Sequence, residues 1–223
     1  MNIDTEVVTG KHERASFLLG VPTLGMVPIE FAIAFTRLQM PVNSISHSMV
    51  VTKTEIGVAR DYICKTALGM KPRPKYVLFI GDDHIPPWDA AIKLWQEMET
   101  GKWDVLSALY YMKQKEVPMP IAWREEVCGP LIPHKHYEPG EVISLDVVPM
   151  DFTIIRTSFL EKLELPYFLT GPSIIECNNG EKQLLFHTED VYFCDKVKKA
   201  GGHIGCHTGI RVGHLDCRTG EVY

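Results

Sequence analysis

The sequence predicts an α/β fold, with one domain built on a mixed, mostly parallel central sheet flanked by helices. Apolar segments of strand length alternate with segments of helical spacing along the first half of the chain. At 223 residues, the chain is long enough to bury a real core as one domain. Its composition, 45% apolar and 23% charged, is that of an ordinary globular protein.

The alternation is clearest before residue 113. Short apolar runs that end at Gly or Pro predict strands, and apolar residues repeated at intervals of three or four predict helices. The expected elements are a strand over 17–21, a helix from Pro28 to Pro41, a strand over 42–52, a helix over 54–68 closed by Gly69, a strand over 76–80, a helix from Pro86 to Gly101 with an apolar stripe of Trp88, Ala91, Ile92, Trp95 and Met98, and a strand over 104–112.

The second half of the chain is less regular. Strand-like pieces over 119–123 and 143–148 precede a strand that leads into a short helix over 151–163. A helix is expected from Thr188, a plausible N-cap, because acidic residues open this segment and lysines close it, as the helix dipole favours. A last strand-like segment covers 203–216. We expect the basic runs 71–75 and 196–199 to be solvated surface.

Charge and cysteine usage narrow the class of protein. A formal charge of −5 argues against a broad nucleic-acid-binding face. The six cysteines contain no CxxC pair and the N-terminus has no apolar leader, so we expect reduced thiols in a cytoplasmic protein. The apolar segment 17–35 is long enough to span a membrane, but its glycines and prolines favour strand, loop and helix instead, so no transmembrane segment is expected.

A cluster of polar residues follows the apolar strand over 76–80. Asp82, Asp83 and His84 come directly after Gly81, at what should be the carboxyl end of a sheet strand, where ligands bind in open α/β sheets. Adjacent carboxylates repel each other, so a cation, a surface turn or a cap on the next helix must account for them. Oxygen ligands suit Mg²⁺ or Mn²⁺, and an imidazole shifts the preference toward Mn²⁺.

Other well-known signatures are missing. The chain has no G-x-G-x-x-G after its first strand and no G-x-x-x-x-G-K-[ST], so a glycine-rich phosphate cradle is not how it would hold a nucleotide. It also lacks the G-x-S-x-G and H-E-x-x-H patterns of common hydrolases.

Six segments in order resemble the GT-A-fold glycosyltransferases, particularly the family 2-like, metal-dependent enzymes with a DxD motif. The resemblance covers most of residues 16–216. The segments are VPTLG (21–25), GVARDYICKTAL (57–68), FIGDDHIPPWDAAIKL (79–94), VVPMDFTIIRTSFLEKLELPYF (147–168), TEDVYFCDKVKKAGG (188–202) and IRVGHLD (210–216).

The resemblance implies a hexosyltransferase-type activity. A UDP- or GDP-sugar would be the donor, a glycan or other hydroxyl compound the acceptor, and Mn²⁺ or Mg²⁺ the cofactor. Residues 16–112 would form the donor-binding half and 113–223 the acceptor and catalytic half. The implied metal ligands are Asp83 and His214, with His84. The implied donor-site residues are Pro22, Thr23, Arg60, Asp82 and Asp151. The implied general base of an inverting reaction is Asp190, with Glu189 beside it.

The chain departs from the motif at one position. Aligned through the two prolines, the first acid of DxD falls on Gly81, so either Asp82 takes that role or His84 becomes the second ligand. This departure keeps open a non-catalytic nucleotide-sugar or glycan-binding module on the same fold. A sugar-1-phosphate nucleotidyltransferase fits less well, because VPTLGMVP offers neither a glycine run nor a basic residue.

Several residues have simpler interpretations. Glu189 and Asp190 also suit a plain helix N-terminus, and Asp151 also suits a buried structural role. Aromatic residues of the first half are expected mainly in the core, whereas some in the middle segment could border an acceptor. The core candidates are Trp88, Trp95, Tyr110 and Tyr111, and the acceptor candidates are Trp123, His134, His136 and Tyr137.

A zinc site is disfavoured, because the spacing of its candidate ligands matches no known zinc finger. Those candidates are His203, Cys206, His207, His214 and Cys217.

Overall fold

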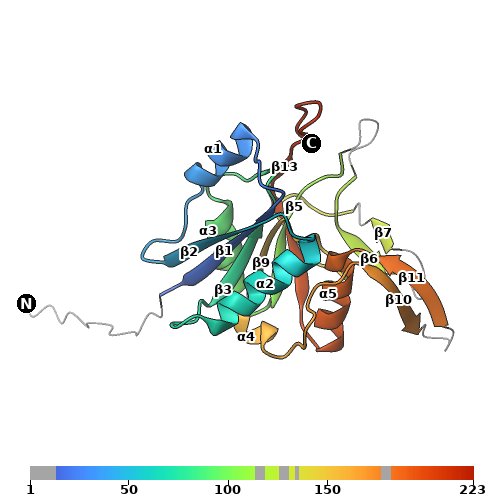
Figure 1. The fold of residues 1–223 in the computed structure, drawn as a ribbon. Coiled ribbons are helices and arrows are strands. Elements are labelled where there is room, and N and C mark those ends of the chain that lie inside the picture. The colour runs from blue at the N-terminus through green and yellow to red at the C-terminus, as the bar shows by residue number, and fades with distance from the viewer. Residues whose placement is uncertain (1–13, 114–118, 126–130, 134–135, 177–181) are drawn as a thin grey trace, which may run out of the picture.

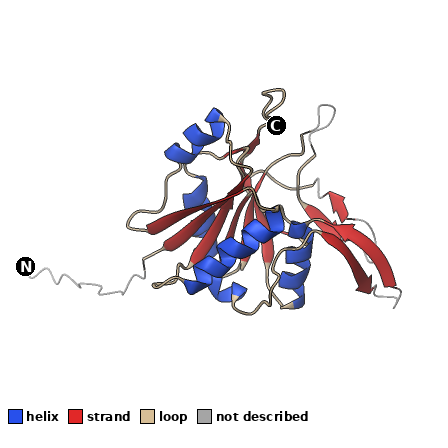
Figure 2. Ribbon diagram, in the orientation of Figure 1, coloured by secondary structure: helices blue, strands red, loops and turns tan. Residues whose placement is uncertain are grey.

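The computed structural model describes residues 14–113, 119–125, 131–133, 136–176 and 182–223. A seven-stranded sheet forms its centre, as Figures 1 and 2 show. The strand order is β2 (Ile45–Thr52), β1 (Ser16–Thr23), β3 (Tyr76–Ile80), β9 (Phe152–Arg156), β5 (Val105–Leu109), β12 (Ile204–Arg211) and β8 (Val142–Ser144).

The sheet is mixed but mostly parallel, as predicted. Strand β1 pairs in parallel with β2 and β3, and β5 pairs in parallel with β12. Strand β9 runs antiparallel between β3 and β5, and β8 is antiparallel at the edge. The carboxyl ends of β1, β3 and β5 therefore meet at one edge of the sheet.

Helices cover both faces of the sheet. Apolar residues of α2 (Ile56–Gly69), α4 (Thr157–Leu160) and α5 (Glu189–Lys199) form one core cluster with the sheet. Those of α1 (Ile29–Arg37) and α3 (Ala90–Glu99) form the other. Strand β3 is buried throughout and divides its side chains between the clusters, with Val77 and Phe79 on one side and Tyr76, Leu78 and Ile80 on the other. Both faces are covered, which explains its continuous apolar sequence.

Among the described residues, three small sheets lie outside the central one. Strand β4 (His84–Ile85) pairs with β13 (Gly213–His214) beside the carboxyl edge. Strands β6 (Trp123–Glu125) and β7 (Leu131–Pro133) form a second antiparallel pair. The hairpin of β10 (Gly171–Glu176) and β11 (Lys182–His187), which the sequence pattern did not predict, extends away from the body of the molecule in Figure 1.

The helix expected from Pro86 was wrong at its start. Helix α3 begins at Ala90, and its buried residues are Ala90, Ala91, Leu94 and Met98. Trp88 precedes it and is 57% exposed. His84 and Ile85, which precede the helix, instead form β4 and pair with β13. Trp88 lies between β4 and α3, outside the helix, and so is not part of its buried stripe. Ile92 and Trp95 are only partly buried.

Other strand boundaries also differ from the prediction. Around 119–123 the chain makes a single bridge between Pro120 and Tyr111 before β6. Strand β8 ends at Ser144, although Val147 and Val148 are buried in the core. Apolar character therefore marked burial in this region more reliably than strand pairing. Within the described residues, no helix is both long and apolar enough to cross a membrane.

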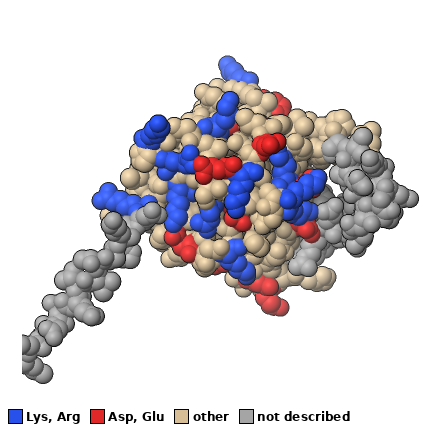
Figure 3. All heavy atoms as spheres, turned by 90° about the horizontal axis from the view of Figure 1, so that it is seen from below, with Lys and Arg blue, Asp and Glu red and all other residues tan. Residues whose placement is uncertain are grey.

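Lysines and arginines are spread over the face seen from below, with acidic side chains between them (Figure 3). Ion pairs near the amino ends of the strands include Arg73 with Glu161 and Lys75 with Glu99. These exposed pairs are typical of a solvated surface, as we expected for the basic run 71–75.

Candidate functional site

Three predicted metal ligands converge at the carboxyl edge of the sheet. Asp83 follows β3, His84 lies in β4 and His214 lies in β13, which pairs with β4. The pairing sets His214 directly opposite His84, and their rings stack with centroids 4.4 Å apart. One ligand atom from each residue lies within 4.8 Å of the others. We call these residues the cation-site cluster.

The donor atoms of this cluster suit a divalent cation. His84 is 1% exposed, and neither of its ring nitrogens makes a hydrogen bond with a described residue, although Nδ1 lies 2.7 Å from Asp83 Oδ1. A buried polar atom without a partner is costly, so this imidazole is suited to a ligand. One carboxylate with two imidazoles is a donor set that Mn²⁺ accepts.

The second imidazole is already oriented. His214 Nδ1 lies 2.8 Å from the carbonyl oxygen of Tyr111, an acceptor only, so Nδ1 carries the proton. Nε2 is then unprotonated in the neutral ring and lies 3.5 Å from Asp83 Oδ2. A hydrogen bond of this kind fixes the tautomer and direction of a ligating histidine.

Asp83 is held as a carboxylate. Burial raises its pKa, but interactions with His214, His84 and Lys113 outweigh burial and hold the pKa well below its usual range. Neighbouring Asp82 is half-buried and makes no hydrogen bond or ion pair with the described part of the chain. Its carboxylate is therefore available to a ligand at the same edge.

The missing acid at Gly81 has a steric explanation. A Cβ at position 81 would lie 2.6 Å from His84 Nδ1 and 2.8 Å from Asp151 Cβ. The backbone N–H of Gly81 also donates to the Asp151 carbonyl oxygen at 2.6 Å. Asp151 and His84 thus occupy the space that a side chain would need.

Arg60 lies beneath the cluster and joins three elements. From α2, its Nη2 lies 2.6 Å from Oδ1 of Asp151, just before β9, and its Nη1 lies 2.5 Å from Oε1 of Glu189, the first residue of α5. Its side chain is 2% exposed, and the guanidinium lies over the rings of Phe79 and Phe168. We expected Arg60 to approach a diphosphate; instead its Nη groups are engaged by carboxylates below the surface.

The charges in this network perturb one another. Burial lowers the pKa of Arg60, but Asp151 and Glu189 reverse the effect and raise it. For Asp151, burial raises the pKa, but Arg60 opposes this effect and the net pKa is lowered. Burial dominates at Glu189 and raises its pKa, despite the opposing effect of Arg60.

The two acids that open α5 have different environments. The Glu189 carboxylate faces inward to Arg60 and also accepts a hydrogen bond from Thr170 at 3.2 Å. Asp190 is half-buried, accepts a hydrogen bond from the Thr188 hydroxyl, and lies 3.1 Å from the Val191 amide nitrogen. Thr188 occupies the N-cap position, as expected, but its side chain caps no backbone N–H. It contacts Asp190 instead.

Pro22 and Thr23 end strand β1. Strand β1 is adjacent to β3 and parallel to it, so these residues lie at the same sheet edge as Asp82 and Asp83. Pro22 is buried, whereas Thr23 is partly exposed and accepts the Gly25 N–H at 3.1 Å. The structure therefore brings both to the side of the cation-site cluster.

The zinc alternative is not supported by the described residues. Cys206 is fully buried in the core, and the metal-compatible group found in the described ranges is the cation-site cluster alone. His203 belongs to a different environment, 3.6 Å from Asp104. Of the proposed ligands, His214 is the one brought to that cluster.

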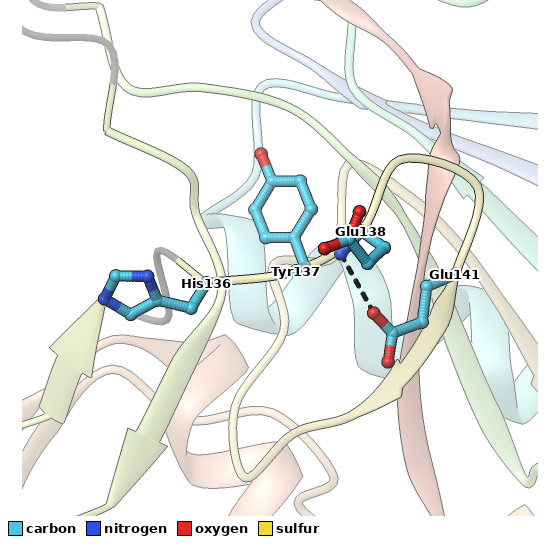
Figure 4. A pocket seen from close by; sticks show the side chains of 4 residues that line it. All are labelled: His136, Tyr137, Glu138 and Glu141. Atoms are coloured by element: carbon cyan, nitrogen blue, oxygen red, sulfur yellow. Dashed lines mark hydrogen bonds between the residues drawn. The ribbon is translucent and has the colours of Figure 1, made fainter.

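The acceptor candidates are placed only in part. Tyr137 lines a pocket with His136, Glu138 and Glu141 (Figure 4), and its hydroxyl lies 2.8 Å from that of Tyr111. Burial and this contact raise the pKa of Tyr137 to about 12. His134 and the side chain of Trp123 lie outside the described residues.

Sequence reasoning missed four residues of the site. Tyr110, fully buried as expected of a core residue, also donates its hydroxyl to Asp151 at 3.2 Å. Tyr111 orients His214 through a backbone carbonyl, which leaves no signature in the sequence. Lys113 and Thr170 contact Asp83 and Glu189 respectively. Only the position of Tyr110 and Tyr111 at the end of the strand predicted over 104–112, and of Lys113 just after it, could have suggested them.

The fold resembles that of several solved structures. A197 from STIV superposes with a TM-score of 0.59 at 19% identity, covering 90% of this chain and 85% of that one. GalNAc-T7, solved with UDP, GalNAc and Mn²⁺, gives a TM-score of 0.53 at 10% identity, covering 92% and 44%. TarS 1–349 from S. aureus gives 0.52 at 14% identity, covering 88% and 60%.

These neighbours include glycosyltransferases, and they establish a GT-A-like α/β fold for this chain. The chain spans less than half of the GalNAc-T7 chain and 60% of the TarS chain. No protein-family model and no curated protein matches the sequence.

Proposed function

We propose that this protein is a metal-dependent glycosyltransferase of the hexosyltransferase type, which moves a sugar from a nucleoside diphosphate to an acceptor hydroxyl with inversion. One observation carries the proposal: Asp83, His84 and His214 converge at the carboxyl edge of a GT-A-like sheet. Ligands of open α/β sheets bind at this edge.

The cation-site cluster would hold Mn²⁺ or Mg²⁺. Its donor set, with Nε2 of buried His84 making no hydrogen bond with a described residue, supports Mn²⁺ in particular. When bound, the cation supplies positive charge where negative charge develops on the departing nucleoside diphosphate. The neighbour GalNAc-T7 was solved with UDP and Mn²⁺, which supports a UDP-sugar over a GDP-sugar as the first donor to test.

The donor would lie along the ends of β1 and β3. Pro22 and Thr23 would border the nucleotide, and the unpartnered Asp82 carboxylate would accept hydrogen bonds from ribose hydroxyls or join the cation. Asp151 is 31% exposed, so it can also contact the donor sugar. Arg60 would act from below by holding Asp151 and Glu189 in place.

Asp190 would be the general base. Its carboxylate takes the proton from the acceptor hydroxyl as that oxygen bonds to the anomeric carbon of the sugar, and the bond from that carbon to the diphosphate oxygen breaks with its electron pair. A positioned base contributes a rate factor of about 10² to 10⁴. Glu189 is engaged with Arg60, so of the two acids Asp190 is better placed for this role.

We further propose that residues 16–112 supply most donor contacts and 113–223 most acceptor contacts. Tyr137 and its pocket would lie on the acceptor side, because Tyr137 contacts Tyr111, whose carbonyl orients His214. The acceptor would be a glycan or another hydroxyl compound. A cytoplasmic location fits the reduced cysteines at 64, 194, 206 and 217.

The test is release of UDP or GDP from a panel of sugar nucleotides with Mn²⁺, using glycan acceptors. We expect release that EDTA abolishes, and a loss of about 10²-fold or more in kcat for Asp190→Asn with unchanged nucleotide affinity. Asp195→Asn is the matched control, since Asp195 lies on the same helix and pairs with Lys199 at the surface.

A protein that binds the nucleotide without turning it over, with Asp190→Asn indistinguishable from wild type, would contradict the enzyme and favour a nucleotide-sugar-binding module. Gly81, which first suggested that alternative, has the separate steric explanation given above. The transferase therefore remains the better-supported proposal.

A further inference from the structure

Lys113 lies against the carboxylate at the centre of the cation-site cluster. Its Nζ is 2.5 Å from Asp83 Oδ2, the same oxygen that lies 3.5 Å from His214 Nε2. The other carboxylate oxygen faces His84. Lys113 thus adds an ammonium to the group of atoms that a cation would need.

The Lys113 ammonium and a divalent cation would compete for this oxygen. Both are positive, and the site is partly buried, with Asp83 26% and Lys113 30% exposed, so solvent screens their repulsion incompletely. A lysine carries a compact charge on a flexible stem, so its ammonium can move aside without moving the backbone. A cation bound at Asp83 Oδ2 would therefore favour movement of the ammonium away from it.

A diphosphate gives the displaced ammonium a new partner. Phosphate oxygens on a bound cation lie within a few ångströms of its ligands, and phosphate forms strong charge-assisted hydrogen bonds with lysine. The chain places Lys113 just beyond the carboxyl end of β5, on the ligand-binding edge. The move from Asp83 to a phosphate is therefore short.

We propose that Lys113 competes with the divalent cation for Asp83 and, when a donor is present, binds the donor's diphosphate. The lysine thereby makes cation binding weak without nucleotide and strong with it. The competition with the cation needs only the cluster itself, whereas the choice of diphosphate rests on the function proposed above. Lys113 would thereby determine the order in which the cation and the donor bind to the site.

The first arm of the test titrates the full chain with Mn²⁺ alone and measures free Mn²⁺ by electron paramagnetic resonance. We expect Lys113→Met to bind Mn²⁺ about fivefold or more tightly than wild type, the lower range of typical couplings between ligands, and Lys113→Arg to remain near wild type. Lys75→Met is the matched control. Lys75 is 32% exposed and paired with Glu99, but lies before β3, at the opposite end of the strand from Asp83.

The second arm measures UDP affinity by calorimetry at saturating Mn²⁺. We expect Lys113→Met to bind UDP about fivefold or more weakly, and Lys113→Arg to restore the affinity. The opposite signs of the two changes distinguish this proposal from a structural role, because a variant that merely disorders the site would lose affinity for both ligands.

The outcomes separate this inference from the proposed function. Unchanged or weaker Mn²⁺ binding by Lys113→Met overturns the inference, whether or not the protein transfers sugar. Absence of Mn²⁺ binding by both wild type and Lys113→Met overturns the cation site and the inference with it. Tighter Mn²⁺ and weaker UDP binding in a protein that turns over no donor supports the inference and contradicts the transferase.

Discussion

At the scale of single residues, Gly81 determines how the cation-site cluster is arranged. His84 Nδ1 and the Asp151 side chain lie so close to its Cα that a Cβ would overlap both. The glycine therefore allows an imidazole and a carboxylate from two distant segments to approach the same end of β3. This role depends on close approach, not on a left-handed backbone.

We expect Gly81→Ala to lower the free energy of unfolding by about 1–3 kcal/mol, because the methyl group forces His84 or Asp151 out of position. Mn²⁺ affinity should fall with it. Chemical denaturation and Mn²⁺ titration measure the two effects. Gly69→Ala is the control, because a Cβ at position 69 would have no neighbouring atom within 4 Å, and a wild-type-like Gly81→Ala would contradict the steric explanation.

Thr188 provides a second test at the residue scale. Its hydroxyl donates to Asp190 and caps no backbone N–H, so its effect should fall on the proposed base more than on the helix. We expect Thr188→Ala to lower kcat severalfold while stability changes by less than about 1 kcal/mol. Thr188→Ser, which keeps the hydroxyl, should recover kcat; a large loss of stability without a change in kcat would indicate an ordinary cap.

Sequence reasoning at this scale depended on chemical type. Asp83, His84 and His214 were recognisable as candidate ligands, because carboxylate and imidazole groups at predicted strand ends indicate a cation. Tyr111 was not, since it acts through a backbone carbonyl that every residue has. The burial of Arg60 was not predicted, because its pattern indicates a charge but says nothing about depth.

At the scale of elements, the antiparallel strand β9 makes the site possible. It is inserted between β3 and β5 and brings Asp151 beside Gly81. Helix α2 approaches the start of α5 at Gly57, where a Cβ would lie 3.4 Å from Glu189 Cβ. Arg60, one turn further along α2, then reaches β9 and α5 together.

We expect Arg60→Met to lower the free energy of unfolding by about 3–5 kcal/mol, because it leaves buried Glu189 without its cation and Asp151 without its partner. Urea denaturation measures the loss. Arg73→Met is the matched control: Arg73 pairs with Glu161 at the surface, with 41% and 47% exposure, and should cost less than about 1 kcal/mol. Equal losses of unfolding free energy in the two variants would contradict the role of Arg60 in linking α2, β9 and α5.

At the scale of the whole molecule, one sheet separates two apolar clusters and collects the polar site at its carboxyl edge. The proposed donor side comes from the segments ending β1 and β3, and the proposed base from the start of α5. A ligand bound across this edge would contact residues far apart in the chain. Its binding should therefore stabilise the fold as a unit.

We expect Mn²⁺ with UDP, each at about 100 times its dissociation constant, to raise the melting temperature by about 10–20 °C, and EDTA to remove the Mn²⁺-dependent part. Differential scanning calorimetry provides the measurement. His214→Gln should lose the Mn²⁺-dependent part while folding normally without ligand. If no nucleotide or cation shifts the melting temperature, the site assignment is wrong.

The order and type of the main strands and helices were set by the sequence, because apolar periodicity and proline or glycine positions act over short distances. The polar cluster after β3 and the acidic start of α5 could be predicted for the same reason, since each lies within one short stretch of the sequence. Long-range packing alone decided that β9 enters the sheet antiparallel, that β10 and β11 form a hairpin, and that Arg60 is buried. Tertiary contacts between segments up to 131 residues apart, such as His214 and Asp83, also decided which acids and histidines share one site, since no local pattern encodes a distance between separate strands.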